Sequence, residues 1–246
     1  MSKIIITGAT SGIGLRLAES YASMGWKVGV SGRNENILKS LKDRFPQQIE
    51  WEKIDINRED APGKLYELIG KLGGMDIYLH VSGIGYDNLE LDIKRDVEIA
   101  ETNVVGFTRM VDAAYHYFKK VSAKGHKGHI AAITSVAGTK GIGSMAAYSA
   151  SKRYQYTYLQ AIEQLANIDG VKLSITDIRP GWVKTPLLNE GSNYPLTMKL
   201  DKVVPIIINA IRKQMRIAVV DWRWATAIFF WRLIPGCIWV KIPYKP

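Results

Sequence analysis

Residues 3–14 read KIIITGATSGIG, and this stretch decides the fold. Its first five residues form a short, largely β-branched run, which is typical of a buried parallel strand. Glycines follow at positions 8, 12 and 14, and residues 15–24 have a helical pattern. A strand, a glycine-rich loop and a helix in this order direct backbone N–H groups and a helix N-terminus at a pyrophosphate. The stretch therefore predicts a dinucleotide site at the first strand-to-helix turn.

Each glycine of the loop has a predicted role. We expect Gly8 to make the tight turn, Gly12 to let the phosphates approach the backbone, and Gly14 to let the helix and strand pack closely. The spacing is G-x-x-x-G-x-G, not the common G-x-G-x-x-G. A glycine-rich loop alone is a weak signal, but its place between a strand and a helix makes it a strong one.

The rest of the chain continues to alternate between strand-like and helical stretches. Strands are predicted at residues 3–7, 26–31, 49–54, 75–81, 128–134, 172–178 and 216–220. Helices are predicted near residues 12–24, 34–45, 58–72, 95–122, 144–167 and 200–214. This alternation indicates βαβ units, and so a Rossmann-like, doubly wound parallel sheet in a three-layer α/β/α fold. We expect one domain over residues 1–246, with a substrate loop at 186–200 and an aromatic, basic tail at 221–246.

Composition and charge limit the classes of function. With 246 residues and 47% hydrophobic content, the chain can bury one large core. The single cysteine, Cys237, cannot form an internal disulfide, and the four histidines suggest no metal-ligand cluster. A first strand at residue 3 leaves no room for a signal peptide, which predicts a cytoplasmic protein.

The charge is strongly positive and unevenly placed. The net charge is +10, and residues 201–246 carry eight Lys or Arg against two Asp, a net +6. Basic patches attract nucleic acids, membranes or anionic ligands. No nucleic-acid motif accompanies these residues, so we expect no nucleic-acid partner.

Tyr148 and Lys152 stand four residues apart in the run AAYSASK (146–152), within a predicted helix. Residues i and i+4 share one helix face, so the phenol and the ammonium can reach the same cleft. A nearby cation favours the phenolate and lowers the tyrosine pKa, which makes the hydroxyl usable in acid–base catalysis. The other tyrosines of this helix have no lysine four residues further on; they are Tyr154, Tyr156 and Tyr158.

Together these motifs resemble the short-chain dehydrogenase/reductase family, in its type of roughly 250 residues. The resemblance runs from residue 3 to about residue 220. In chain order it rests on the glycine loop after Thr7, on Asp55 at the end of the third strand, and on Asn103, Ser135, Tyr148 with Lys152, Pro180-Gly181 and Thr185.

The resemblance implies a catalytic set of four residues. Ser135, at the end of a predicted strand, would bond the substrate carbonyl oxygen and hold it against Tyr148. Tyr148 would donate its proton while a nicotinamide delivers hydride, and Lys152 would also hold the nicotinamide ribose. Asn103 would bind a water that links Lys152 to solvent as a proton relay. Because asparagine is mildly unfavourable inside a helix, a kink or a solvated face within 95–122 is the alternative explanation for it.

Other positions are implied to hold the cofactor. Asp55 would accept a bond from the adenine amino group, and the backbone of 179–185 with Thr185 would hold the carboxamide. Where the family usually reads Asn-Asn-Ala-Gly, residues 80–83 read HVSG; we interpret this as a local structural change in which His80 is a core residue. The expected cofactor contacts are Gly8, Ser11, Gly12, Ile13, Gly14, Arg33, Asp55, Ile56, Gly83, Asn103, Tyr148, Lys152, Pro180, Gly181, Val183 and Thr185.

The residues after the second strand bear on the choice of cofactor. An enzyme that prefers NAD usually has a carboxylate there, which binds the ribose 2′-hydroxyl. This chain has Gly32 followed by Arg33. A guanidinium suits a 2′-phosphate through paired, charge-assisted hydrogen bonds, whereas the alternative is a solvated loop arginine. Ser11 stands where NADP-preferring members often have a basic residue. On balance we predict NADP(H) in preference to NAD(H).

These features predict an NADPH-dependent carbonyl reductase, or an alcohol dehydrogenase running in reverse, with an apolar carbonyl or alcohol substrate. The rival hypothesis is a non-catalytic NADP(H)-binding sensor or scaffold. An intact set of catalytic residues argues against the rival, because a sensor needs no proton relay. We also expect a homo-oligomer, formed through the helices at 95–122 and 144–167 or through the tail.

Two segments near the C-terminus leave alternatives open. Residues 187–198 have no strong periodicity, and are either a mobile lid over the substrate or a surface loop. Four of the seven tryptophans lie in the last 25 residues, and the apolar run 224–234 is far shorter than the roughly 20 residues that span a bilayer. This tail either packs as a pocket wall or subunit contact, lies weakly on a membrane surface, or binds a partner.

Overall fold

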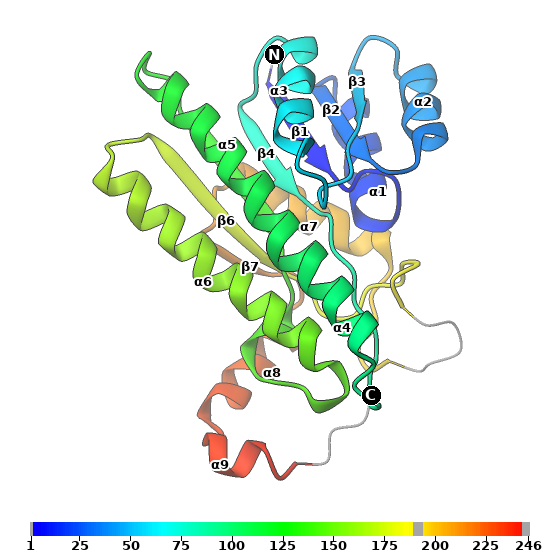
Figure 1. Ribbon diagram of the computed structural model, residues 1–246, viewed down its shortest axis with the longest axis vertical. Coiled ribbons are helices and arrows are strands. Elements are labelled where there is room, and N and C mark those ends of the chain that lie inside the picture. The colour runs from blue at the N-terminus through cyan, green and yellow to red at the C-terminus, as the bar shows by residue number, and fades with distance from the viewer. Residues whose placement is uncertain (1, 189–193, 243–246) are drawn as a thin grey trace.

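The computed structural model describes residues 2–188 and 194–242, and a parallel sheet of seven strands crosses its centre (Figure 1). The strand order is β3-β2-β1-β4-β5-β6-β7, and every pairing within it is parallel. The order reverses between β1 and β4, which is where open α/β sheets bind their ligands. The strands are β1 (Lys3–Thr7), β2 (Lys27–Gly32), β3 (Ile49–Lys53), β4 (Ile77–His80), β5 (Gly128–Ile133), β6 (Leu173–Arg179) and β7 (Ile217–Val219).

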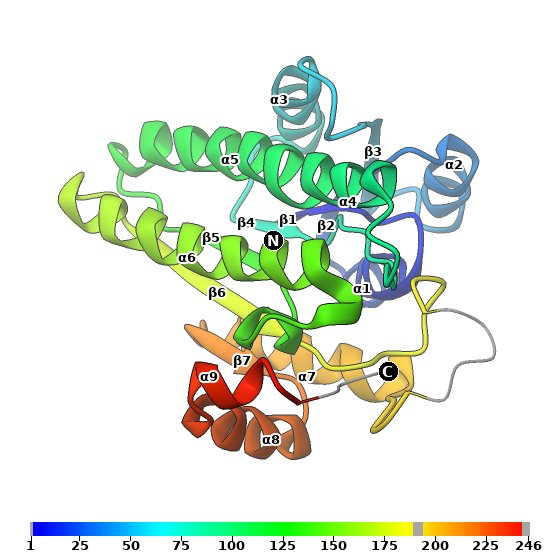
Figure 2. The ribbon, with the colours of Figure 1, turned by 60° about the horizontal axis from the view of Figure 1, so that its bottom comes forward.

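Helices cover both faces of this sheet, which confirms the predicted three-layer fold (Figure 2). One face carries α1, α2 and α7, and the other carries α3, α5 and α6. The helices that precede the tail are α1 (Gly12–Ser23), α2 (Glu35–Arg44), α3 (Ala61–Leu72), α4 (Ile93–Ala100), α5 (Phe107–Ser122), α6 (Ala146–Ile168) and α7 (Leu200–Arg212).

The side chains of β1 show why the sheet forms between two cores. Ile4 and Ile6 belong to the core beneath α1 and α7, whereas Ile5 belongs to the core beneath α3, α5 and α6. Successive strand residues point to opposite faces, so a continuous apolar run suits a strand that is covered on both sides. All three isoleucines are completely buried.

The single helix predicted at 95–122 is interrupted. The chain forms α4, then a π-helical turn at Glu101–Gly106, and then α5. A π turn widens the helix locally and is often found at functional sites. Asn103 lies inside this turn and is completely buried. The helix therefore does change its geometry at this asparagine, and a solvated helix face is excluded.

The tail contains two helices that the sequence pattern does not predict, α8 (Trp222–Leu233) and α9 (Gly236–Trp239). They lie at the end of the molecule toward which the strands run (Figures 1 and 2). No helix within residues 2–188 and 194–242 is long and apolar enough to cross a bilayer. Of the predicted substrate loop and tail, residues 189–193 and 243–246 lie outside the described residues.

Candidate active site

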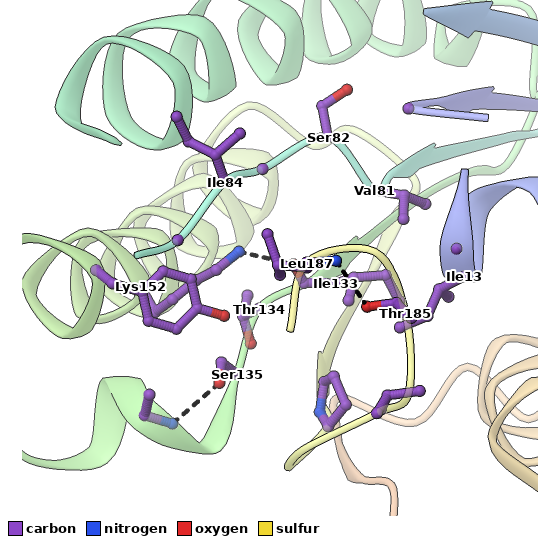
Figure 3. A pocket seen from close by; sticks show the side chains of 18 of the residues that line it. Ile13, Val81, Ser82, Ile84, Ile133, Thr134, Ser135, Lys152, Thr185 and Leu187 are labelled. Atoms are coloured by element: carbon purple, nitrogen blue, oxygen red, sulfur yellow. Dashed lines mark hydrogen bonds between the residues drawn. The ribbon is translucent and has the colours of Figure 1, made fainter. Parts of the chain in front are cut away.

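A cavity of about 460 Å³ opens at the carboxyl ends of the strands, and most of the predicted site residues line it. Figure 3 shows its walls: Ile13 comes from the first turn of α1, Ser82 from the segment after β4, Ser135 from the segment after β5, and Lys152 from α6. The predicted residues on the wall are Gly8, Ser11, Gly12, Ile13, Arg33, Asp55, Ile56, Gly83, Ser135, Tyr148, Lys152, Pro180, Gly181, Val183 and Thr185. Gly14 and Asn103 are not on the wall.

The glycine loop has the geometry that the sequence predicts. Gly8 has a φ of 88°, which favours glycine, and its N–H donates to the Ser31 carbonyl over 2.9 Å. A Cβ added to Gly14 would lie 2.1 Å from the Gly8 carbonyl oxygen, so only glycine lets α1 pack this closely on the loop. The N-cap of α1, Ser11, makes no side-chain capping bond. The first N–H groups of α1 therefore remain available to an anion, which fits a pyrophosphate.

Tyr148 and Lys152 lie one turn apart on α6 and both line the cavity. The Lys152 Nζ is 5.7 Å from the centre of the Tyr148 ring. It donates to the Ile133 carbonyl over 3.2 Å and to Gln155 Oε1 over 3.1 Å. These two bonds fix the ammonium at the carboxyl end of β5, on the cavity wall.

Burial decides the proton affinities of this pair. Burial raises the pKa of Tyr148, and a hydrogen bond with Ser135 acts in the opposite direction. Burial lowers the pKa of Lys152 to about 8, while the charge of Asp177 opposes that change. The sequence led us to expect a lowered tyrosine pKa. That expectation was wrong in direction because removing a phenolate from water outweighs the stabilising contacts.

Ser135 lies two residues after the end of β5 and is buried beside Tyr148. Its hydroxyl accepts from the Ala137 N–H over 3.1 Å, a bond that Figure 3 shows as a dashed line. Its carbonyl accepts from the Tyr156 hydroxyl. Tyr156 in turn stacks against the Arg179 guanidinium at 3.7 Å. Ser135 is thus held through both its side chain and its backbone carbonyl.

Asn103 lies behind the cavity wall, not on it. Its Oδ1 accepts from the Ile84 N–H over 2.9 Å, and its Nδ2 donates to the Ile84 carbonyl and to Ser151 Oγ over 2.7 and 3.0 Å. Its own carbonyl accepts from Gln155 Nε2 over 2.9 Å. The amide of Asn103 therefore ties the segment after β4 to α6, and its carbonyl is already engaged.

Gln155 is a site residue that the sequence analysis missed. Its side chain is completely buried and joins Lys152 Nζ to the Asn103 carbonyl. The available signal was a glutamine three residues after the lysine, on the helix face that carries Tyr148 and Lys152. Its meaning depends on Asn103, which is 52 residues away in the chain.

The adenosine end of the predicted cofactor site contains both exposed and buried residues. Arg33 is exposed at the rim and forms no ion pair with another residue in the described part of the chain. Asp55 Oδ1 accepts from the Asn57 N–H over 3.1 Å, which leaves its other oxygen free of protein hydrogen bonds within the same residues. Ile56 is buried beside it. A Cβ on Gly32 would lie 2.6 Å from the Thr10 methyl group, so this turn packs tightly.

The segment after β6 packs next to the glycine loop on the cavity wall. A Cβ on Gly12 would lie 3.3 Å from the Thr185 side chain. Val183 pairs with Met198, and this pairing closes the base of the predicted substrate loop. The Trp182 ring packs on Tyr194 at 4.4 Å. The ends of the loop are therefore anchored to the cavity wall.

The tail contributes directly to the cavity. Trp224 and Trp231 of α8 line it, and Trp224 is 4% exposed. Trp224 lies so close to Gly181 that an added Cβ there would meet its Nε1 at 2.0 Å. One face of the tail is thus a pocket wall, which was the first of the three alternatives.

His80 has the structural role that its sequence position suggested. Its Nδ1 shares a 2.9 Å hydrogen bond with the Tyr78 hydroxyl, and its ring packs edge-on against Phe107. Burial lowers its pKa to about 3, so the ring is neutral. In the described ranges, no group of His, Cys, Asp and Glu side chains has the arrangement of a metal site.

Comparisons with known proteins agree with this geometry. Residues 2–194 match the family model of the short chain dehydrogenases. An uncharacterized oxidoreductase of Myxococcus xanthus is 30% identical over 203 residues, which cover 80% of this chain and 78% of that protein. An uncharacterized oxidoreductase of Mycobacterium tuberculosis is 29% identical over 244 residues, covering 95% and 94%.

Solved structures share the fold at lower identity. A short chain dehydrogenase/reductase from Burkholderia phymatum in complex with NAD has a TM-score of 0.83 at 18% identity, covering 100% of this chain and 97% of that one. A 3-ketoacyl-(acyl-carrier-protein) reductase from Brucella melitensis complexed with NADH has a TM-score of 0.78 at 21% identity, covering 89% and 95%. With its glycine loop, its Tyr148–Lys152 pair and the match over residues 2–194, the chain belongs to the short-chain dehydrogenase/reductase family and is an NAD(P)-dependent oxidoreductase acting on CH–OH or C=O groups.

Proposed function

We propose that this protein is an NADPH-dependent reductase of apolar carbonyl compounds, which also runs in reverse as an alcohol dehydrogenase. The observation that carries the proposal is a shared wall: Ser135, Tyr148 and Lys152 line the same cavity as the glycine loop. A carbonyl oxygen within reach of the first two residues is then also close to the cofactor region.

The pKa of Tyr148 favours reduction at neutral pH. Because burial raises that pKa, the phenol is protonated and can act as the acid that a carbonyl oxygen needs. A bound reduced nicotinamide supplies the hydride. The Ser135 hydroxyl orients the carbonyl oxygen, and the Lys152 cation stabilises the phenolate that remains after proton transfer.

The substrate side of the cavity favours an apolar molecule. Beyond Tyr148 its wall consists mostly of aromatic and aliphatic side chains. An apolar carbonyl compound suits such a wall. The apolar lining residues are Ile142, Met145, Trp182, Leu187, Leu188, Trp224 and Trp231.

The preference for NADPH rests on Arg33 and Gly32. Arg33 lines the cavity at its rim and has a free guanidinium in the described chain. Gly32 provides no carboxylate to bind a ribose 2′-hydroxyl, and its tight packing on Thr10 disfavours a larger residue. A guanidinium can bind a 2′-phosphate with two hydrogen bonds.

A reductase screen tests the proposal. The purified protein is incubated with NADPH or NADH and a panel of apolar ketones and oxo-lipids, and nicotinamide oxidation is followed by absorbance. The proposal is supported if the parent reduces any of these ketones, and if Tyr148→Phe lowers that turnover by about 100-fold or more while its affinity for NADPH stays nearly unchanged. Tight NADPH binding without turnover across the panel would favour the rival sensor or scaffold.

The oligomeric state stays a prediction. Exposed apolar side chains on α4 and the π turn, including Ile93, Val97 and Val105, would suit a contact between copies of the chain. Sedimentation velocity at micromolar concentration measures this directly, and a monomer at high micromolar concentration contradicts it.

A further inference from the structure

Helix α8 carries large apolar side chains on all sides, with two arginines among them, yet only one of its faces is covered. Trp224 and Ile228 pack into the core, whereas Phe229, Phe230 and Leu233 are each about three-fifths exposed. A helix that is hydrophobic all round is normally buried. In 222–242 the exposed large apolar side chains are between 43% and 79% exposed; they are Trp222, Phe229, Phe230, Leu233, Ile238, Val240 and Ile242.

The charge of the α8–α9 segment (residues 222–242) has one sign. Arg232 and Lys241 are exposed, and the sequence of the segment contains no Asp or Glu. Arg223 is exposed as well, but it is paired over 2.6 Å with Asp221, which directly precedes the segment. Lys140 adds a further cation next to it, because it donates to the Ile234 carbonyl over 2.8 Å and lies 5.8 Å from the Trp239 ring centre. Aromatic residues bordered by cations are the composition of helices that lie in a bilayer surface.

From this combination we infer that the α8–α9 segment docks on an anionic lipid bilayer. A second copy of the chain would fit less well. In a two-fold contact the same patch faces itself, so Arg232 and Lys241 would meet like charges with no acidic residue of the segment to pair with. A bilayer surface with anionic headgroups offers both apolar depth and opposite charge.

The docked segment also borders the cavity. Trp231 lines the cavity and packs on Trp239 of α9 at 5.5 Å, so α8 separates the cavity from the proposed lipid surface. Leu187, which is 45% exposed, lines the cavity from the substrate loop. If the proposed carbonyl reductase activity holds, its substrate would be a carbonyl or hydroxyl compound that partitions into lipid and enters beside α8.

Vesicle co-sedimentation of the full chain tests the docking without any substrate. The vesicles contain phosphatidylcholine alone or with phosphatidylglycerol, at low and high salt. We expect binding to the anionic vesicles that weakens as salt rises. The double variant Phe229→Gln with Phe230→Gln should lose about tenfold or more of the partition coefficient. Arg232→Gln and Lys241→Gln should each lose about fivefold, which corresponds to about 1 kcal/mol per cation.

The matched control is Ile168→Gln, because Ile168 is 76% exposed at the far end of α6, away from α8 and α9 (Figures 1 and 2). This variant should bind like the parent. An absence of pelleting with every vesicle, or full binding by the double phenylalanine variant, would overturn the inference. A third result would also overturn it. If sedimentation velocity showed that the parent is an oligomer that binds no vesicles, and that the double phenylalanine variant is a monomer, the exposed face of α8 would be a contact between two copies of the chain.

A separate observation concerns Gln155. Its Oε1 accepts from Lys152 Nζ over 3.1 Å, and its Nε2 donates to the Asn103 carbonyl over 2.9 Å. We infer that Gln155 is a positioning residue, whose amide provides the link between Lys152 and Asn103 that the resemblance assigns to a water. It holds the ammonium toward Tyr148 and favours its charged form.

Several charged or titratable groups face Lys152 and set the background for a test. Tyr148 lies on the same helix, His80 ends β4, and Asp177 on β6 is paired with Arg179 over 2.6 Å. All of these residues are the same in the parent and in the Gln155 variants. Gln155→Met removes an acceptor from the ammonium and should lower the lysine pKa, whereas Gln155→Glu adds a negative charge and should raise it.

The test compares the pH dependence of the parent, Gln155→Met and Gln155→Glu. Because this inference rests on the proposed function, two readouts are used. In the reductase assay, the alkaline limb should move by about one pH unit to lower pH in the Met variant and to higher pH in the Glu variant. The pH dependence of urea unfolding should move in the same directions, and it needs no turnover.

The control is Gln160→Met, an exposed glutamine on the same helix, which should leave both profiles in place. Two results would overturn the inference. In the first, both Gln155 variants lose turnover but the alkaline limbs of their pH–rate profiles stay where the parent has them. In the second, both limbs move in the same direction. Either result would mean that the Gln155 side chain only fills space in the core. Moved unfolding profiles in a protein that reduces no carbonyl would refute the proposed activity and leave the role of Gln155 intact.

Discussion

Replacing Lys152 by methionine tests how much the buried ammonium of Lys152 costs the stability of the fold. Lys152 is 4% exposed, and burial lowers its pKa from 10.5 to about 8 while Asp177 opposes the change. Methionine keeps an unbranched stem of similar length and removes the ammonium. Between pH 8 and 10.5 the folded chain should therefore have released a proton that the unfolded chain still binds.

The sign and size of the effect follow from linkage. A cation with a lowered folded-state pKa destabilises the fold at neutral pH, and that penalty disappears as the pH rises past the folded value. A shift of this size corresponds to about 3 kcal/mol at pH 7, of which about 2 kcal/mol should be regained by pH 9.5. Lys152→Met leaves the Ile133 carbonyl and Gln155 Oε1 without their donor, which costs about 1–3 kcal/mol per acceptor at every pH and so does not alter the slope.

Urea unfolding of both proteins at several pH values between 7 and 9.5 measures this difference. Tyrosines whose pKa is raised by burial contribute equally to both proteins and cancel. Lys124→Met, at an exposed position after α5, is the control and should follow the parent. If the parent and Lys152→Met changed stability with pH in parallel, within about 0.5 kcal/mol, the reasoning about a buried cation would be refuted. Reductive turnover of the parent should also fall above about pH 8, as the cation is lost.

Three further substitutions probe the cavity walls. Arg33→Asp should weaken NADPH binding by about 2–5 kcal/mol and NADH binding little, as titration with each cofactor would show; equal losses would contradict a bond to the 2′-phosphate. Gly14→Ala should weaken both cofactors by tenfold or more, because its methyl group would collide with the Gly8 carbonyl, and retained affinity would contradict the packing described. Trp224→Ala should enlarge the cavity and raise kcat/KM for bulkier ketones relative to small ones, and an unchanged ratio would remove α8 from the substrate wall.

The sheet could be predicted from the sequence because its signals are local. A β-branched run before a glycine loop defines β1, and each later strand lies within two residues of its predicted range. The tail helices could not be predicted in this way. An apolar stripe at helical spacing identifies an amphipathic helix, but the apolar side chains of α8 are spread over all its faces and form no stripe.

In the candidate site, too, features with a local sequence signal could be predicted and features that depend on distant contacts could not. The spacing of Tyr148 and Lys152 brings them to one helix face, and the structure keeps them there. Spacing contains no information on burial, so the direction of the Tyr148 pKa was wrong. Gln155 was missed because its partners include a backbone carbonyl from a distant segment, which no pattern within α6 can indicate.

The link through Gln155 depends on the break in the long helix before α5. In a regular α-helix each carbonyl already accepts an N–H from four residues further on, and offers little to a side chain from elsewhere. The π turn at Glu101–Gly106 changes that ladder to i→i+5 bonds, and the Asn103 carbonyl accepts a hydrogen bond from the Gln155 side chain. The unfavourable placement of an asparagine in a helix and the buried glutamine of α6 are therefore two parts of one arrangement. Its effect is to give the buried Lys152 ammonium an acceptor, which keeps a cation within reach of Tyr148 at neutral pH.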